Sequence, residues 1–118
     1  MKLSIGDIID RWTIAYLKQY RGKIDTLAEQ RAYSEYCSNY EQQFLKDSWD
    51  NLLEFNGKIW TLESDIRLGK EGELGLEEVG RRALQIRDFN KERINIKNRI
   101  NEYFEEGFIE RKVNHGSE

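Results

Sequence analysis

Apolar residues between Ser4 and Gly22 recur at the spacing of an α-helix. Ser4 is a favoured N-cap with Asp7 three residues later, and Gly22 is typical of the position just after a helix end. On a helical wheel, the apolar side chains cover more than half of the circumference: Ile5, Ile8, Ile9, Trp12, Ala15, Tyr16, Leu17 and Tyr20. A helix with so wide an apolar arc is surrounded on most sides. We therefore expect it to lie centrally in a bundle or to contact a second subunit.

Two further apolar stripes with helical spacing lie between Ile24 and Leu68. The first consists of Tyr33, Cys37, Tyr40 and Phe44, and the second of Leu52, Phe55, Ile59, Leu62 and Ile66. The phases of the two stripes do not join smoothly around Lys46–Asp50. The pattern therefore predicts a break or kink at that point, with Asp47 or Ser48 as the N-cap of a new helix.

The glycine-rich segment Gly69–Gly75, GKEGELG, is the clearest loop signal in the chain. A last helix is predicted from about Leu76 to Phe104, followed by an extended tail that lies on the bundle. Proline is absent and helix-forming residues are abundant throughout. We predict an all-α fold, an antiparallel bundle of three to four helices with a short extended C-terminal tail, and a single domain over residues 1–118.

The core-facing stripe of the last predicted helix turns polar at Asn90, Arg93 and Lys97. Because a short loop makes neighbouring helices antiparallel, Asn56 of the preceding helix should lie beside Asn90. Asn56 and Glu63 interrupt the apolar seam of that preceding helix, and Glu63 should lie near one of the arginines that follow the loop. Facing polar residues imply a hydrogen-bonded network, since each buried polar atom without a partner costs about 1 to 3 kcal/mol.

Arg93 and Lys97 need carboxylate partners, for which the candidates are Asp7, Asp10 and Asp50. Two interpretations stay open. The network can fix the register of the helices, as a polar residue does in a coiled coil. Alternatively, Asn90, Arg93 and Lys97 can line a cleft that binds an anion, which the surplus of basic residues in the last helix favours. The candidate polar seam or anion cleft consists of Asp10, Asn56, Glu63, Asn90, Arg93 and Lys97.

The composition narrows the classes of function. Charged residues make up 35% of the chain but the net charge is only -3, which disfavours a basic nucleic-acid-binding protein. The single cysteine excludes an intramolecular disulfide and fits a reducing compartment. No apolar run approaches the roughly 20 residues that span a bilayer. We expect a cytoplasmic protein without a membrane span, and its many tryptophans and tyrosines suggest an interface as well as a core.

Catalytic motifs are sparse. His115 is the only histidine and lies in the tail, and Cys37 sits among tyrosines at the spacing of a buried residue. All-α nucleotide pyrophosphohydrolases hold Mg²⁺ between carboxylates three or four residues apart on paired helices. Here Glu63 and Asp65 are two residues apart, and Glu77 and Glu78 are adjacent. We therefore expect no catalytic residue, cofactor or metal site, and the sequence disfavours an enzyme.

Three blocks stand out together: GDIIDRWTIAYLK at Gly6–Lys18, NGKIWTLESDIR at Asn56–Arg67 and RDFNKERINIKNRINE at Arg87–Glu102. In order and spacing they resemble a bacterial family of short helical proteins defined as a domain of unknown function. The resemblance implies an all-helical fold and a context of glycosyl transfer and surface polysaccharides, and it supplies no catalytic residue. The polar positions shared in type are Asp10, Lys18, Asn56, Trp60, Glu63, Arg67, Asn90 and Lys97.

These observations lead to two hypotheses about function. The first is a non-enzymatic interaction module that forms a homodimer or binds another protein through its aromatic-rich first half. The alternative is a binding module for an anionic small ligand such as a nucleotide or a sugar phosphate, centred on Arg93 and Lys97. A metal-dependent nucleotide pyrophosphohydrolase is less favoured than either, and a nucleic acid is an unlikely partner.

Overall fold

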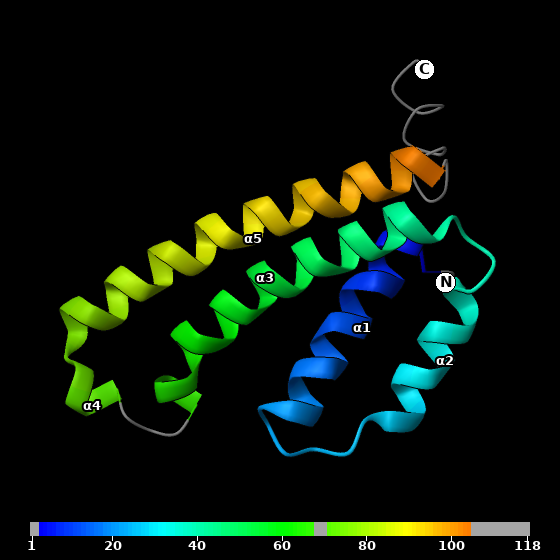
Figure 1. The fold of residues 1–118 in the computed structure, drawn as a ribbon. Helices are drawn as coiled ribbons and strands as arrows, with labels where there is room; N and C mark the ends of the chain where they lie inside the picture. Colours follow the sequence, from blue (N-terminus) through cyan, green and yellow to red (C-terminus); the bar gives the residue numbers. More distant parts are fainter. Residues whose placement is uncertain (1–2, 68–70, 105–118) are drawn as a thin grey trace.

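The computed structural model describes residues 3–67 and 71–104 of the chain (Figure 1). Within these ranges all regular structure is helical, which confirms the predicted all-α class. Four long helices and one helical turn follow one another: α1 (Ile5–Tyr20), α2 (Leu27–Cys37), α3 (Gln42–Arg67), α4 (Glu71–Leu74) and α5 (Leu76–Phe104). The predicted extended tail lies outside the described residues.

The helices α3 and α5 run side by side as a long antiparallel pair (Figure 1). The ring centroids of Phe55 and Phe89 are 6.0 Å apart, and Arg82 Nη1 donates to the carbonyl oxygen of Leu62 at 3.2 Å. Both contacts place Asn56 level with Asn90 across the pair. The register predicted from the loop is therefore confirmed.

The first helix, α1, lies centrally and packs against α2, α3 and α5. Ser4 is its N-cap, since Ser4 Oγ accepts a hydrogen bond from the backbone N–H of Asp7 at 3.1 Å. At the other end, the N–H groups of Arg21 and Gly22 both donate to the carbonyl oxygen of Leu17. Most of the wide apolar arc of α1 is thus covered within the bundle itself, as a central position predicts, while Tyr20 at the end of the helix is exposed.

The core lies where α1 meets the other three long helices. Its buried apolar residues are Ile5, Ile8, Ile9, Cys37, Leu45, Leu52, Ile96 and Ile100. Aromatic side chains surround this cluster and pack on one another: the Trp49 ring meets those of Trp12 at 5.9 Å and Tyr16 at 5.2 Å, both edge to face. Much of the aromatic surface that suggested an interface is therefore used inside the chain.

The break predicted at Lys46–Asp50 is wrong, because α3 continues through that segment without interruption. The chain turns earlier, between the end of α2 at Cys37 and the start of α3 at Gln42. Glu41 caps α3: its carboxylate accepts from the backbone N–H groups of Gln43 at 2.8 Å and Phe44 at 3.0 Å. Glutamate is a weaker N-cap signal than aspartate or serine, so the sequence pointed to Asp47 and Ser48 instead.

The loop predicted at Gly69–Gly75 is only partly correct, because its second half contains the helical turn α4. Gly75 separates α4 from α5 with a φ of 83°, in the left-handed region that favours glycine. The carbonyl oxygen of Gly75 then accepts from the N–H of Val79 at 3.1 Å, which begins the ladder of α5. The start and end of α5 agree with the prediction.

Candidate functional site

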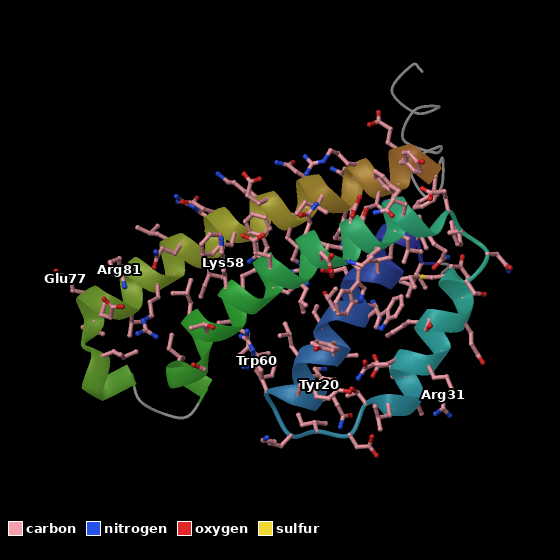
Figure 2. All side chains as sticks on the ribbon, in the orientation of Figure 1. Tyr20, Arg31, Lys58, Trp60, Glu77 and Arg81 are labelled. Carbon is pink, nitrogen blue, oxygen red and sulfur yellow. The ribbon has the colours of Figure 1, made fainter. Side chains whose placement is uncertain are left out.

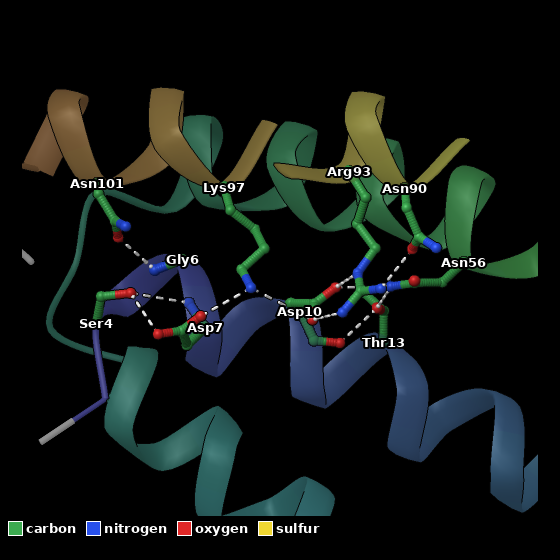
Figure 3. A network of polar contacts seen from close by, with 10 residues as sticks. All are labelled: Ser4, Gly6, Asp7, Asp10, Thr13, Asn56, Asn90, Arg93, Lys97 and Asn101. Atoms are coloured by element: carbon green, nitrogen blue, oxygen red, sulfur yellow. Dashed lines mark hydrogen bonds and ion pairs between the residues drawn. The ribbon is translucent and has the colours of Figure 1, made fainter. Parts of the chain in front are cut away.

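Asp10 is the centre of a polar network between α1, α3 and α5 (Figure 3). Its side chain is only 4% exposed. Arg93 of α5 donates to both carboxylate oxygens, from Nε to Oδ1 at 2.9 Å and from Nη2 to Oδ2 at 3.0 Å. Such a two-point pair is the strongest arrangement of these two groups, because both hydrogen bonds are charge-assisted. The predicted partner of Arg93 is thereby identified as Asp10.

Asn56 joins the network from α3. Its Nδ2 group donates to Asp10 Oδ1 at 2.9 Å and to Thr13 Oγ1 at 2.8 Å, and Thr13 in turn donates to the carbonyl oxygen of Asp10 at 2.7 Å. Asp10, Thr13 and Asn56 are all buried. Since a carboxylate only accepts hydrogen bonds, the contact with Asp10 fixes which end of the Asn56 amide points into the network.

Asn90 lies on α5, one turn before Arg93. Its Oδ1 accepts a hydrogen bond from Arg93 Nη1 at 2.9 Å. No hydrogen bond joins Asn56 to Asn90 among the described residues, so the two amides meet only through Asp10 and Arg93. The prediction that both belong to one network is correct, but they do not pair with each other.

Lys97 extends the network towards the start of α1. Its Nζ lies 2.8 Å from Asp7 Oδ1 and 4.0 Å from Asp10 Oδ2. Burial raises the pKa of Asp7, but hydrogen bonds and charge from Lys97, together with hydrogen bonds from Ser4, outweigh burial and leave this pKa below its usual value. The positive charges of Arg93 and Lys97 are thus both balanced by carboxylates of α1.

The α1 backbone comes very close to α5 at Gly6. The N–H of Gly6 donates to Asn101 Oδ1 at 2.7 Å (Figure 3). A Cβ atom at this position would lie 2.7 Å from the carbonyl oxygen of Lys97 and 2.8 Å from Asn101 Oδ1. Because no carbon atom tolerates such distances, a glycine is needed at this contact.

Two other predicted residues lie apart from the network. Asp50 forms an exposed ion pair with Lys46 at 3.0 Å and does not contact Arg93 or Lys97. Glu63 is two helical turns beyond Asn56 on α3 and lines a neighbouring pocket. The structure therefore brings together five of the predicted candidates and places Glu63 in a second, adjoining feature; the five are Asp10, Asn56, Asn90, Arg93 and Lys97.

The pocket opens beside the network, between the C-terminal half of α1, α3 and α5, and has a volume of about 710 Å³. Its walls follow from helical spacing, since each helix contributes residues three or four positions apart. The lining residues are Ile14, Leu17, Lys18, Arg21, Gly22 and Ile24 from α1 and the turn after it, Asn56, Ile59, Trp60, Glu63 and Ser64 from α3, and Asn90 and Arg93 from α5. Neither Asp10 nor Lys97 reaches it.

Trp60 forms one wall of the pocket. Figure 2 shows it between α3 and the C-terminal end of α1, not far from Tyr20. A Cβ atom at Gly22 would lie 3.0 Å from Trp60 Cη2, so the indole rests directly on the turn that ends α1. A rigid aromatic wall with a few convergent polar groups is typical of small-ligand sites.

The rim of the pocket carries positive charges without a carboxylate partner. Lys18 is exposed and makes no ion pair within the described part of the chain. Arg21 donates from Nη1 to the carbonyl oxygen of Gly57 at 3.2 Å and more weakly to Thr61 Oγ1 at 3.4 Å, neither of which is charged. Glu63 is the carboxylate on the wall. The pocket can therefore attract an anion more readily than the closed network can.

Sequence reasoning did not select Lys18, Arg21 and Trp60 as site residues. The signal was present in α3, where Asn56, Ile59, Trp60 and Glu63 share one helical face. The predicted cleft was instead centred on Arg93 and Lys97, because basic residues are in surplus in the last helix. Lys18 and Arg21 lie beside this face of α3 because α1 and the turn after it pack against α3.

Among residues 3–67 and 71–104, no group of three histidine, cysteine, aspartate or glutamate side chains could hold a metal ion. None of the described helices is both long enough and apolar enough to cross a bilayer. His115 lies outside the described residues. Within the described ranges, the network, the pocket beside it and the charges of Lys18 and Arg21 are the candidate features for binding.

Comparisons with protein-family models, with curated proteins and with solved structures found no match to this chain. The resemblance of its three sequence blocks to a family of unknown function accordingly stays a prediction.

Proposed function

We propose that this chain is a binding module for a small anionic ligand, which occupies the pocket between α1, α3 and α5. The observation that carries the proposal is the exposed Lys18 ammonium, which has no ion-pair partner among the described residues and lines a pocket of about 710 Å³. This site adjoins the predicted cleft, but other cations would bind the anion. In the predicted cleft these were Arg93 and Lys97, and in the proposed pocket they are Lys18 and Arg21.

The electrostatics favour this new centre. An anion near Arg93 or Lys97 would compete with Asp10 and Asp7, which already lie within hydrogen-bond distance of them. Near Lys18 it would meet a cation whose charge is balanced only by solvent. Hydrogen bonds from a cation to an anion are about twice as strong as neutral ones, so Lys18 and Arg21 can supply much of the affinity.

The apolar walls favour a ligand that is more than a bare anion. Ile14, Leu17, Ile59 and Trp60 are among the residues that line the pocket, and a ligand gains about 25 cal/mol for each Å² of apolar surface that it buries there. Inorganic phosphate has no such surface. An organic molecule with an anionic end, such as a nucleotide or a sugar phosphate, suits the combination.

A thermal-shift screen of the purified chain against phosphorylated metabolites tests the proposal. A ligand at 100 times its dissociation constant stabilises the folded state by about 2.7 kcal/mol, which gives a clear rise in Tm. Lys18→Gln should abolish most of this rise. Lys91→Gln, which removes an exposed charge of α5 outside the pocket, is the matched control. Absence of any shift across the panel would contradict the proposal.

Self-association is a second candidate function, and a different observation favours it. Three apolar side chains around the α1–α2 connection are at least half exposed: Tyr20 at 55%, Ile24 at 52% and Leu27 at 50%. If they form an interface, light scattering should show a dimer that Leu27→Ser weakens. A strictly monomeric chain at every concentration would argue against this role. The family resemblance would connect either function with glycosyl transfer or surface polysaccharides.

A further inference from the structure

The two amides that line the pocket each leave one end unused. Asn56 donates through Nδ2 to Asp10 and Thr13, while its Oδ1 makes no hydrogen bond to the described residues. Asn90 accepts through Oδ1 from Arg93, while its Nδ2 likewise has no partner in the described part of the chain. Asn56 as a residue is only 6% exposed, but its Oδ1 is not a fully buried atom, so water or a ligand can pair with it.

The network fixes the orientation of both amides. Asp10 can only accept, so Asn56 must turn Nδ2 towards it, and Arg93 can only donate, so Asn90 must turn Oδ1 towards it. The two unused groups are therefore an acceptor on Asn56 and a donor on Asn90, both on the pocket wall. A matching ligand presents a donor and an acceptor side by side. The pairing edge of a nucleobase has this pattern, and proteins read bases through it.

The spacing along α1 sets the length of the ligand. Thr13 is in contact with Asn56, and Lys18 and Arg21 follow five and eight residues later. At 1.5 Å per residue, the backbone of Lys18 lies about 8 Å along α1 from Thr13. The guanidinium of Arg21 reaches back to the carbonyl oxygen of Gly57, next to Asn56. A ligand that meets both the amides and Lys18 is extended, as a nucleoside monophosphate is between the pairing edge of its base and its phosphate.

Trp60 lies one helical turn after Asn56 on α3, lines the pocket and rests against Gly22. Its indole offers an apolar surface for a planar ring, and contacts between bases and aromatic side chains are favourable for every base. We infer that the ligand of this pocket is a nucleotide, with its base held by Asn56, Asn90 and Trp60 and its phosphate at Lys18 and Arg21. This inference rests on the proposed function and narrows it to one class of ligand.

Binding of nucleoside monophosphates should be compared with binding of ribose phosphate and inorganic phosphate to the purified chain. Tryptophan fluorescence and thermal shift both serve as readouts, because Trp60 lines the pocket. The nucleotide inference predicts that at least one nucleoside monophosphate binds about tenfold or more tightly than ribose phosphate, since only the base satisfies the two amides.

Asn90→Asp is the decisive variant. It keeps an oxygen for Arg93 and replaces the donor in the pocket with an acceptor. The added charge should weaken both ligands, but nucleotide affinity should fall about tenfold or more beyond the loss that ribose phosphate shows. Asn98→Asp, on an exposed position of α5, controls for the added charge. Circular dichroism checks that both variants fold.

The outcomes separate the two ideas. If ribose phosphate binds as tightly as every nucleotide, or if Asn90→Asp weakens both ligands equally, the nucleotide inference is overturned and the anion pocket stands. If no phosphorylated compound binds at all, the proposed function fails together with the inference.

Discussion

The network around Asp10 and the pocket around Lys18 are built from the same three helices. They differ in whether their basic side chains have carboxylate partners. In the network, each cation lies within 3.0 Å of a carboxylate oxygen. In the pocket, Lys18 has no carboxylate at that distance within the described ranges. Arg93 belongs to both features, but Asp10 already holds its guanidinium. Basic residues on one helix are thus open to an anion only where the facing helix leaves them without a carboxylate partner.

Side-chain size at the helix contacts explains why one region is closed and the other open. At the start of α1, Gly6 lets the backbone approach α5 so closely that Asn101 bonds directly to its N–H. At the end of α1, the indole of Trp60 stands between α3 and Gly22. A glycine thus permits a close backbone contact at one end of α1, whereas at the other end a large indole and Gly22 both line the pocket.

The largest effect on stability is expected from breaking the centre of the network. Asp10→Leu leaves the guanidinium of Arg93 and the amide of Asn56 without their buried partner, so unfolding free energy should fall by about 3 to 5 kcal/mol. Urea denaturation measures this. The control is Asp50→Leu, which breaks an exposed pair with Lys46 and should cost less than about 1 kcal/mol. Equal losses in both variants would mean that Asp10 is not the centre of a buried network.

The next largest effect concerns the closed contact at Gly6. Gly6→Ala forces a methyl group against Lys97 and Asn101 and should destabilise the fold by about 1 to 3 kcal/mol. Gly80→Ala is the matched control in α5, where a methyl group would meet no atom within 4 Å. Alanine should stabilise that exposed helical position by about 1 kcal/mol. The two variants should therefore change the unfolding free energy in opposite directions in urea denaturation. A Gly6→Ala variant as stable as the unchanged chain would contradict the close approach of α1 to α5.

Much of the fold could be predicted because helical periodicity is a local property. The limits of α1 and α5 and the pairing of α3 with α5 follow from the apolar spacing, the Ser4 cap and the glycine-rich loop. The turn before α3 was misplaced because Tyr33, Cys37, Tyr40 and Phe44 keep helical spacing across the turn. Periodicity alone does not reveal a chain reversal when apolar residues flank it on both sides.

Of the candidate site, the polar network could be predicted from the sequence and the pocket could not. The polar seam was visible because polar residues interrupt an apolar stripe, and only a network of partners allows that. Asp10 could be proposed as a partner of Arg93, since the sequence limits which carboxylates are near. The pocket was not visible, because it depends on how α1 packs against α3. That packing brings together Trp60 and Gly22, two residues from separate parts of the sequence.

A smaller effect should appear with pH at the edge of the network. The pKa of Asp7 is lowered in the folded state, so its contact with Lys97 stabilises the fold above the unfolded pKa of about 3.9 and is lost as pH falls through the folded value. Asp7→Asn should therefore cost less than about 1 kcal/mol at neutral pH, because this carboxylate is 36% exposed. The cost should shrink below about pH 4.

Denaturation of Asp7→Asn and the unchanged chain at several pH values tests this. Asp88→Asn is the control, because its carboxylate is 61% exposed. A difference between Asp7→Asn and the unchanged chain that stays constant from neutral to acidic pH would show that the charge of Asp7 does not stabilise the fold.

The smallest effect on stability is expected at Lys18. This prediction most directly separates the basic residues of the pocket from those of the network. Lys18→Gln removes a charge that no described residue balances, so unfolding free energy should change by less than about 0.5 kcal/mol. Arg93→Gln, on the same pocket wall, removes the partner of Asp10 and should cost about 3 to 5 kcal/mol. Two basic residues of one pocket would then differ several-fold in their effect on stability, and Lys18 would matter for ligand affinity alone. If Lys18→Gln destabilises the chain as much as Arg93→Gln does, Lys18 has a structural partner, and the pocket is part of the closed network.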